Sequence, residues 1–567
     1  MAVIDESSTL IRENQLPRRP SNAAELEYVD HVGLKEWTEV EDLAKSRGEV
    51  GVPDDIDSEY NILGFKFAFS WATLWAYAGP GWLMSIAFVD PGNLESDLQA
   101  GAYGGYQLIW VLLGATIMGF FLQVLSARLG VVTGKNLAEM CHLMYPRWTS
   151  RVLWFMAEVA IVGSDIQEVL GSAIALQILF KLPLWIGCLV TAVDTYGHIC
   201  MYSEWCGLRF WFTFLLLHHF GVRKLEAFFM ALVAVMLVCF CTNAIQGNPD
   251  ATQVLQGFVP SIPKRYATTQ AVGILGAVIM PYNLFLHSGL VQSRSVDRQD
   301  GRKLAQANKY FAIEGAVALF VSFLINLAVV CVFAQSFFSL DCLPSFDIHG
   351  INTACLPLGA SDSLIYGRCD LAGTTGVCQE IGLSGAGIAL RGVLNSYSET
   401  IWAVGLLAAG QSSTMAGTYA GQFVMEGFLS IRLPPWKRMA LTRAVALVPA
   451  LSVAMWSESR PSESDSMNEF LNVLQSVQLP FALIPILHFT SNPVVMGTFA
   501  NGRTMRLVGW AMTLVVCFVN IYLVVDKVPL ATLAPLAQTA TVGGGLAYFA
   551  FLTYLVALEV KRLVAEK

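Results

Sequence analysis

The sequence predicts an all-α polytopic membrane protein with about twelve transmembrane helices, two of them broken. Its composition is 55% hydrophobic and 14% charged, with a mean hydropathy of +0.54, which is too apolar for ordinary soluble domains. Apolar runs of about 20 residues, the length that spans a bilayer, recur along most of the chain. Two of these runs are interrupted by proline and polar residues, which membranes tolerate only where the backbone faces protein or water.

The first interruption is Phe88-Val89-Asp90-Pro91-Gly92-Asn93, at the end of an apolar run that begins near Phe65. A proline and a glycine predict that the helix breaks here. An ionisable side chain inside a membrane segment marks a functional site, so Asp90 is the leading candidate. The structural alternative is that Asp90 only caps a helix end at the membrane surface.

A second apolar run carries the matching interruption Ala277-Val278-Ile279-Met280-Pro281-Tyr282-Asn283. Proline-broken helices in corresponding positions of two halves indicate a transport site at a repeat interface. We therefore expect Asp90, Asn93 and Met280 to meet.

The predicted spans follow from the apolar runs in order. They are residues 67–90, 107–131, 152–179, 183–217, 225–245, 268–292, 310–337, 395–414, 440–456, 469–489, 506–526 and 540–560. The fourth run is overlong, because Tyr196 to Trp211 inserts His198, Glu204 and Arg209. The sequence leaves open whether this stretch re-enters the membrane, lies outside it, or reflects an error in the gene structure.

Charge sets the expected topology and domain organisation. Most loop Lys and Arg residues fall on the side of the N-terminus, so both termini are expected in the cytoplasm. We expect a flexible cytoplasmic tail over 1–60, a transmembrane domain over 61–560 and a short cytoplasmic tail over 561–567. The loop over 338–390 falls outside, and its four cysteines predict disulfides.

The donor atoms at the two breaks favour a transition-metal ion. Asp90 offers a carboxylate oxygen, Asn93 an amide oxygen, Ala277 a freed carbonyl and Met280 a thioether. Mixed oxygen and sulfur ligands favour Mn(II), Fe(II) or Cd(II) over calcium and magnesium, which prefer oxygen alone. Met280 could instead be a packing residue, as most methionines in such a chain are.

The third span carries Glu158, Asp165 and Glu168, and the last two lie three residues apart on one helical face. Intramembrane carboxylates in a row predict a proton route, with Arg443 as counter-ion; the alternative is a structural ion-pair network. His287 could titrate near neutral pH, although a single histidine is more often a packing residue.

Other classes of protein find no support in the sequence. There is no nucleophile elbow, phosphate loop or paired-carboxylate catalytic motif, so we expect neither an enzyme nor a cofactor. No basic patch with interleaved aromatic residues suggests nucleic-acid binding. The expected partners are divalent metal ions, protons and the lipid bilayer.

Five separated motifs resemble the NRAMP family of divalent metal transporters, especially its eukaryotic branch. They are MSIA at Met84 with DPGNLESD at Asp90, GSDIQEVLGSAIA at Gly163, GAVIMPYN at Gly276, AAGQSSTMAGTYAGQFVMEGF at Ala408 and SVQLPFALIPIL at Ser476. The resemblance implies a LeuT-like inverted repeat of five plus five helices and proton-coupled uptake. It implies metal ligands at Asp90, Asn93, Met280 and the Ala277 carbonyl, with Asn472 joining in occluded states. It also implies a proton route through Asp90, Asp165, Glu168 and Arg443.

The chain departs from the family pattern where Tyr282 replaces the usual histidine after Met-Pro. A tyrosine hydroxyl has a reference pKa near ~10 and should not exchange protons around pH 7. We therefore expect metal transport with an altered pH dependence, with Tyr282 lying on the proton route.

The predicted function is proton-coupled transport of divalent transition-metal ions toward the cytoplasm, across a plasma, endosomal or vacuolar membrane. Two alternatives are a related membrane sensor that no longer transports and a LeuT-fold symporter of another solute. Asp90 would repel an organic carboxylate, which argues against the symporter of another solute. Both helix breaks are largely intact, which argues against a sensor that no longer transports.

Overall fold

The computed structural model describes residues 50–51, 58–62, 65–191, 222–349, 351–361, 363–371, 374–430, 435–457, 462–527 and 535–565. In chain order the helices are α4 (Trp71–Tyr77), α5 (Pro80–Ile86), α6 (Pro91–Gly104), α7 (Ile109–Thr133), α8 (Leu137–Met144), α9 (Arg147–Phe180), α12 (Val222–Gly247), α13 (Ala251–Gly257), α14 (Thr268–Val278), α15 (Pro281–Leu290), α16 (Gly301–Phe337), α17 (Leu343–His349), α18 (Leu383–Val393), α19 (Ser396–Leu429), α20 (Pro435–Ser457), α21 (Ser462–Gln478), α22 (Pro480–Thr490), α23 (Pro493–Met496), α24 (Arg503–Lys527) and α25 (Pro535–Ala565). The strands are β1 (Val50–Gly51), β2 (Ser58–Ile62), β3 (Phe65–Phe69), β4 (Arg294–Ser295), β5 (Ala354–Leu356), β6 (Gly367–Leu371) and β7 (Thr374–Gln379).

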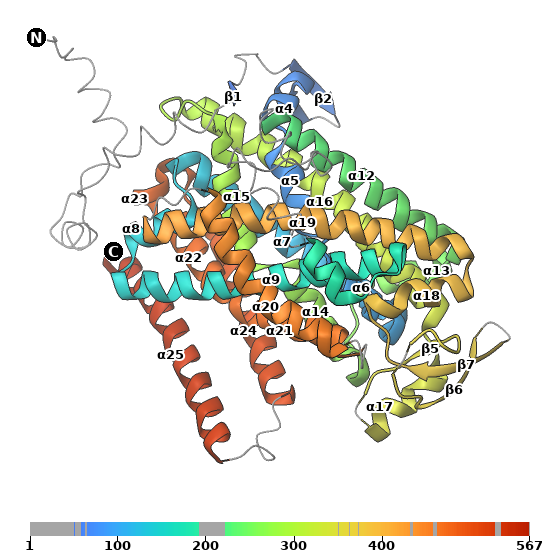
Figure 1. Ribbon diagram of the computed structural model, residues 1–567. Helices are drawn as coiled ribbons and strands as arrows, with labels where there is room; N and C mark the ends of the chain where they lie inside the picture. The colour runs from blue at the N-terminus through green and yellow to red at the C-terminus, as the bar shows by residue number, and fades with distance from the viewer. Residues whose placement is uncertain are drawn as a thin grey trace, which may run out of the picture.

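Long apolar helices dominate the described part of the chain (Figure 1). Within it, eight stretches are long and apolar enough to cross a membrane: Pro91–Thr133, Arg147–Phe180, Glu226–Gly247, Arg265–Ser293, Gly301–Phe337, Met467–Thr490, Arg503–Tyr522 and Thr541–Leu558. The chain is therefore an integral, multi-pass membrane protein. Most of the predicted fourth span, including the Tyr196–Trp211 stretch, lies outside the described residues, as does most of the predicted N-terminal tail.

The predicted bounds of the first span, 67–90, are wrong. The chain forms β3 up to Phe69 and the short helix α4, and the broken helix itself consists of α5, an unwound segment and α6. The break at Asp90 therefore lies inside the crossing rather than at its end. Hydropathy missed α6 because it carries Glu95, Asp97 and other polar residues, yet every residue of α6 is buried.

The helix α19 occupies the interior of the bundle. It packs along α9 and α12, and its buried face carries small and polar residues such as Gly410, Ser412 and Ser413. A helix enclosed by other helices does not need an apolar surface for lipid, so its hydropathy is lower than that of the outer spans. The predicted span 395–414 accordingly continues to Leu429.

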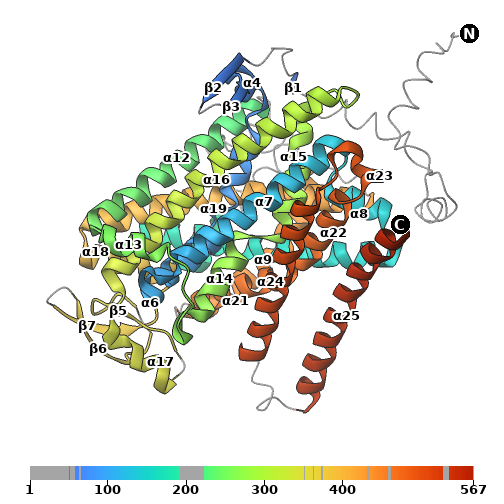
Figure 2. The same ribbon diagram turned by 180° about the vertical axis from the view of Figure 1, so that it is seen from behind.

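The helices α24 and α25 lie at the periphery of the bundle, where both contact α22 (Figures 1 and 2). Their outer faces carry large exposed apolar side chains, including Leu514, Phe518 and Leu546. An apolar surface of this extent is typical of contact with lipid.

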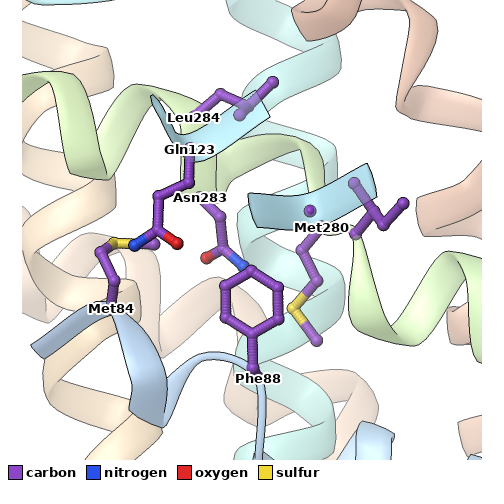
Figure 3. Close-up of a pocket in the computed structure, with 8 residues that line it drawn as sticks. Met84, Phe88, Gln123, Met280, Asn283 and Leu284 are labelled. Carbon is purple, nitrogen blue, oxygen red and sulfur yellow. The ribbon is translucent and has the colours of Figure 1, made fainter. Parts of the chain in front are cut away.

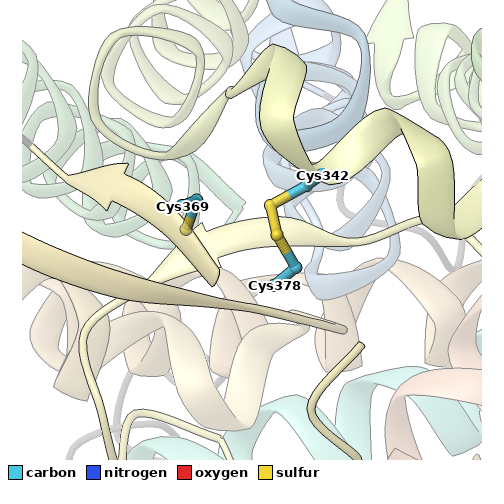
Figure 4. Close-up of side chains that lie close together, drawn as sticks. All are labelled: Cys342, Cys369 and Cys378. Atoms are coloured by element: carbon cyan, nitrogen blue, oxygen red, sulfur yellow. A yellow bond between two sulfur atoms is a disulfide. The ribbon is translucent and has the colours of Figure 1, made fainter. Parts of the chain in front are cut away.

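The predicted loop 338–390 contains α17 and a three-stranded antiparallel sheet in the order β5-β7-β6, at the end of the molecule opposite β2 (Figure 2). The prediction of disulfides is confirmed, because Cys342 pairs with Cys378 and Cys355 pairs with Cys369. Cys342, Cys369 and Cys378 lie close together (Figure 4), and all three are already bonded in disulfides rather than available as metal ligands.

The segment between β7 and α18 contacts α6 through a small set of polar contacts. The Tyr103 hydroxyl accepts a hydrogen bond from the Ile381 backbone N–H (2.9 Å) and donates one to its carbonyl (3.0 Å). A carboxylate oxygen of Glu95 accepts from the Leu383 backbone N–H at 2.8 Å. The disulfide-bonded loop is thus tied to the second half of the first broken helix.

Candidate metal-transport site

Residues within the first break prevent α5 and α6 from forming one continuous helix. Pro91 begins α6 and has no N–H, so the carbonyl of Ala87, four residues earlier, has no helical donor. Asp90 has an extended backbone and caps α6, its side chain accepting from the Asn93 backbone N–H at 2.8 Å. A neighbouring helix, α16, donates to carbonyls around the break: Asn326 donates to Phe88 and Ser322 to Ser85, both at 2.9 Å.

The second break repeats this arrangement. Ile279 and Met280 lie outside both helices between α14 and α15, Met280 with an extended backbone, and Pro281 begins α15. Because Pro281 lacks an N–H, the carbonyl of Ala277 has no helical donor. The Ala277 carbonyl predicted from the sequence thus has an equivalent in the first break, Ala87. Sequence analysis missed Ala87, although the same spacing to a proline would have found it.

The two breaks face each other in the centre of the bundle. Phe88 from the first break and Met280 from the second line one small cavity (Figure 3). Asp90, Asn93, Ala277 and Met280 are each completely buried. The structure therefore brings the two break segments together, as the sequence predicts.

Two oxygen atoms in the first break lack hydrogen-bond partners among the described residues. They are Oδ2 of Asp90 and Oδ1 of Asn93; the other polar atoms of these side chains bond to each other, Asn93 Nδ2 donating to Asp90 Oδ1 at 2.8 Å. Burying a carboxylate oxygen without a partner is strongly unfavourable. A cation coordinated by both free oxygens would remove the cost of burying them without a partner, and the Met280 sulfur would add a soft ligand.

Asn472 on α21 contacts the first break without presenting a free oxygen. Its Nδ2 donates to the Gly92 carbonyl at 3.1 Å, and its Oδ1 accepts from Gln167 Nε2 at 2.8 Å. Gln167 also accepts from Gln475 at 2.9 Å. This glutamine on α9 therefore ties α21 to the site, a role that only tertiary structure reveals.

A chain of hydroxyl groups connects the second break to the carboxylates of α9. Ser164 Oγ lies 2.8 Å from the Tyr282 hydroxyl and donates to a Glu168 carboxylate oxygen at 3.2 Å. Gly417 on α19 makes room beside them, because a Cβ there would lie 2.9 Å from Asp165 Oδ1 and 3.3 Å from Glu168 Oε1. Tyr282, Asp165 and Glu168 thus form one buried polar group.

The other residues predicted for the proton route are more scattered. Glu158 is partly buried near the start of α9 and accepts from Trp154 Nε1 at 3.1 Å. His287 is buried in α15, and its Nδ1 has no hydrogen-bond partner in the described part of the chain. The side chain of Arg443, the predicted counter-ion, lies outside the described residues.

Outside the membrane segments, one carboxylate of the disulfide-bonded loop is perturbed. Burial, and then the charge of Glu469, raises the pKa of Glu380. Both carboxylates are close enough to Tyr103, where the loop contacts α6, for their charges to act on it.

Two opposed helix breaks, with a buried carboxylate, an amide and a thioether, define the class of the protein as a secondary transporter of cations. The profile described as natural resistance-associated macrophage protein-like matches residues 81–526. Natural resistance-associated macrophage protein 2 of Mus musculus is 47% identical over 493 residues, which is 86% of this chain and 81% of that protein. The metal transporter Nramp4 of Arabidopsis thaliana is 43% identical over 517 residues, covering 89% and 90%.

A crystal structure of the Eremococcus coleocola manganese transporter has a similar fold, with a TM-score of 0.71 and 27% identity over 90% of this chain and 99% of that one. The chain belongs to the NRAMP family and has its LeuT-like fold with broken first and sixth helices. It is accordingly a divalent metal transporter rather than an enzyme, and the metal ion is its substrate rather than a cofactor.

Proposed function

We propose that the chain imports divalent transition-metal ions such as Mn(II), Fe(II) and Cd(II) toward the cytoplasm, coupled to protons moving in the same direction. The metal ligands are Asp90, Asn93, Met280 and the carbonyls of Ala87 and Ala277. Asn472 joins them when the site closes over the ion, by turning its oxygen away from Gln167. The observation that carries this proposal is the pair of unpartnered oxygens on Asp90 and Asn93 in a break that faces Met280.

The proton route in this proposal runs from Asp90 to the polar group on α9. Tyr282 and Ser164 connect the second break to Glu168 by hydrogen bonds, and Asp165 lies beside Glu168 across from Gly417. Tyr282 also lies close enough to Asp90 to interact with its charge. Carboxylates in such a row exchange protons in many membrane transporters.

The proposed topology has both termini in the cytoplasm and the disulfide-bonded loop on the opposite side. The distribution of Lys and Arg supports it, as does the presence of two disulfides, which persist on oxidising faces. The membrane is the plasma membrane or that of an endosomal or vacuolar compartment. The predicted domains over 1–60, 61–560 and 561–567 belong to the same proposal.

Uptake into liposomes containing the purified protein tests the function. We expect Mn(II) and Cd(II) to accumulate, accelerated by a proton gradient that is acidic outside, while Ca(II) and Mg(II) do not. Acidification of the lumen during Mn(II) uptake, followed with a trapped pH dye, would report the coupled proton. Uptake that ignores the gradient, with no lumenal acidification, would contradict the coupling.

A further inference from the structure

A small cavity lies beside the proposed metal site, between α5, α7 and α15. It has a volume of about 10 Å³, roughly the space of one water molecule, and Met84, Phe88, Gln123, Met280 and Asn283 line it (Figure 3). Its lining comes from both breaks and from α7, which contributes neither a predicted metal ligand nor a predicted proton-route residue.

Two amide side chains face this cavity without satisfying their polar atoms. Gln123 and Asn283 are only 3% and 4% exposed, and neither side-chain amide has a hydrogen-bond partner within the part of the chain that the structure describes. Buried amides are nearly always paired, because leaving them unpaired is unfavourable. Two such amides at one cavity therefore indicate that the cavity binds a polar ligand, which pairs with them.

A thioether accompanies the amides. Met84 is 1% exposed, and Figure 3 shows its sulfur beside the amide of Gln123, with the amide of Asn283 pointing toward the ring of Phe88. Amide oxygen with thioether sulfur is also the donor pair that Asn93 and Met280 offer at the breaks. Such a mixed set suits a transition-metal ion better than calcium or magnesium.

We propose that this cavity is a second metal site, a relay that receives the ion after it leaves Asp90, with ligands from Met84, Gln123 and Asn283. The proposal rests on the proposed function, since α5 and α15 line the cytoplasmic half of the path only in the proposed topology. The relay has no carboxylate, so it holds the ion more weakly than the Asp90 site and allows its release; water molecules complete the shell.

The ring of Phe88 lines the cavity together with Met84 and Met280. It packs directly against α7 at Gly119, where a Cβ would lie 2.8 Å from the ring. Met280 and Met84 line the same cavity, so in this proposal the ion passes from one sulfur to the other alongside the ring.

Replacing the sulfur tests the relay. In liposomes, we expect Met84→Leu to lower the initial rate of Cd(II) uptake about fivefold more than that of Mn(II), because cadmium depends more on sulfur. We expect Met84→Cys, which restores a sulfur ligand, to keep the wild-type preference for Cd(II). Calorimetric Cd(II) binding at the Asp90 site should stay within about twofold in both variants.

Met496→Leu is the matched control, because Met496 in α23 is also 1% exposed and does not line the cavity. It should leave both uptake rates unchanged. Equal loss of Cd(II) and Mn(II) uptake in Met84→Leu, or the same loss in Met84→Cys, would show that only shape matters and would overturn the relay. A wild-type protein that accumulates neither ion would instead contradict the proposed function itself.

Discussion

At the scale of single residues, the proposed selectivity depends on one sulfur atom at the second break. Met280 is completely buried and lines a cavity with Phe88, which belongs to the same break as the unpartnered oxygens of Asp90 and Asn93. We expect Met280→Ala to reduce discrimination between Mn(II) and Ca(II) by about tenfold, or about 1.4 kcal/mol, because an all-oxygen site no longer disfavours calcium. Competition of Ca(II) against Mn(II) uptake measures this ratio.

The direction of the change distinguishes ligation from packing. If Met280→Ala weakens transport of both ions equally, then the methionine only fills space. Met280→Leu, which keeps the volume, is the control that should behave like Met280→Ala if the sulfur is a ligand.

A second residue-scale prediction concerns Tyr282. Its hydroxyl lies 2.8 Å from Ser164, which in turn donates to Glu168, but tyrosine does not titrate near neutral pH. We expect Tyr282→His to add a titrating group with a reference pKa of about 6.5 to this chain and to steepen the dependence of Mn(II) uptake on external pH between about 5 and 8. Tyr282→Phe, which breaks the hydroxyl chain without adding a base, should not steepen it. Identical pH profiles for wild type and Tyr282→His would refute the role of this position.

At the scale of elements, the start of α5 depends on a carboxylate from another helix. Glu314 on α16 accepts hydrogen bonds from the backbone N–H groups of Gly79, Gly81 and Trp82, the last two at 2.9 and 3.3 Å. These are N–H groups at a helix start that have no partner within α5. A carboxylate at this position also interacts favourably with the positive end of the helix dipole.

Removing this cap should loosen α5, the first half of the first broken helix. We expect Glu314→Ala to leave buried N–H groups unpaired at a cost of about 1–3 kcal/mol and to increase hydrogen exchange across Gly81–Ile86. Glu314→Gln, which keeps an acceptor oxygen, should have a smaller effect. Exchange measured by mass spectrometry should be unchanged in α24, and unchanged exchange in α5 would contradict the capping role.

Sequence predicts these elements unevenly, for physical reasons. Hydropathy finds helices that face lipid, such as α24, but it misplaces α6, whose acidic and amide side chains face other helices. Proline spacing locates both breaks, because a missing N–H is a local property. The contacts of Gln167, Ser164 and Gly417 depend on helices hundreds of residues apart, and no local pattern encodes them.

At the scale of the whole molecule, two disulfides stiffen the loop that holds α6. Gly376 makes their packing possible, since a Cβ there would lie 2.8 Å from Cys355 Sγ and 3.1 Å from Cys369 Sγ. The loop contacts α6 through Tyr103 and Glu95. The two disulfides therefore stiffen a loop that is hydrogen-bonded to α6, the second half of the first broken helix, which begins after the Asp90 cap.

The position of this loop relative to the chain termini provides a test of the proposed topology. With an even number of crossings between the two ends and an odd number between the N-terminus and the loop, both termini lie on one side of the membrane and the cysteines on the other.

In sealed vesicles of known orientation, an impermeant reductant followed by an impermeant maleimide should label Cys342, Cys355, Cys369 and Cys378 only from the side where terminal epitope tags are protected from protease. A variant with all four cysteines replaced by serine should lose this labelling, which excludes Cys239, Cys241 and Cys517 as its source. Labelling and proteolysis from the same side would mean that the loop and the termini share a compartment, which would refute the proposed direction of transport together with the topology.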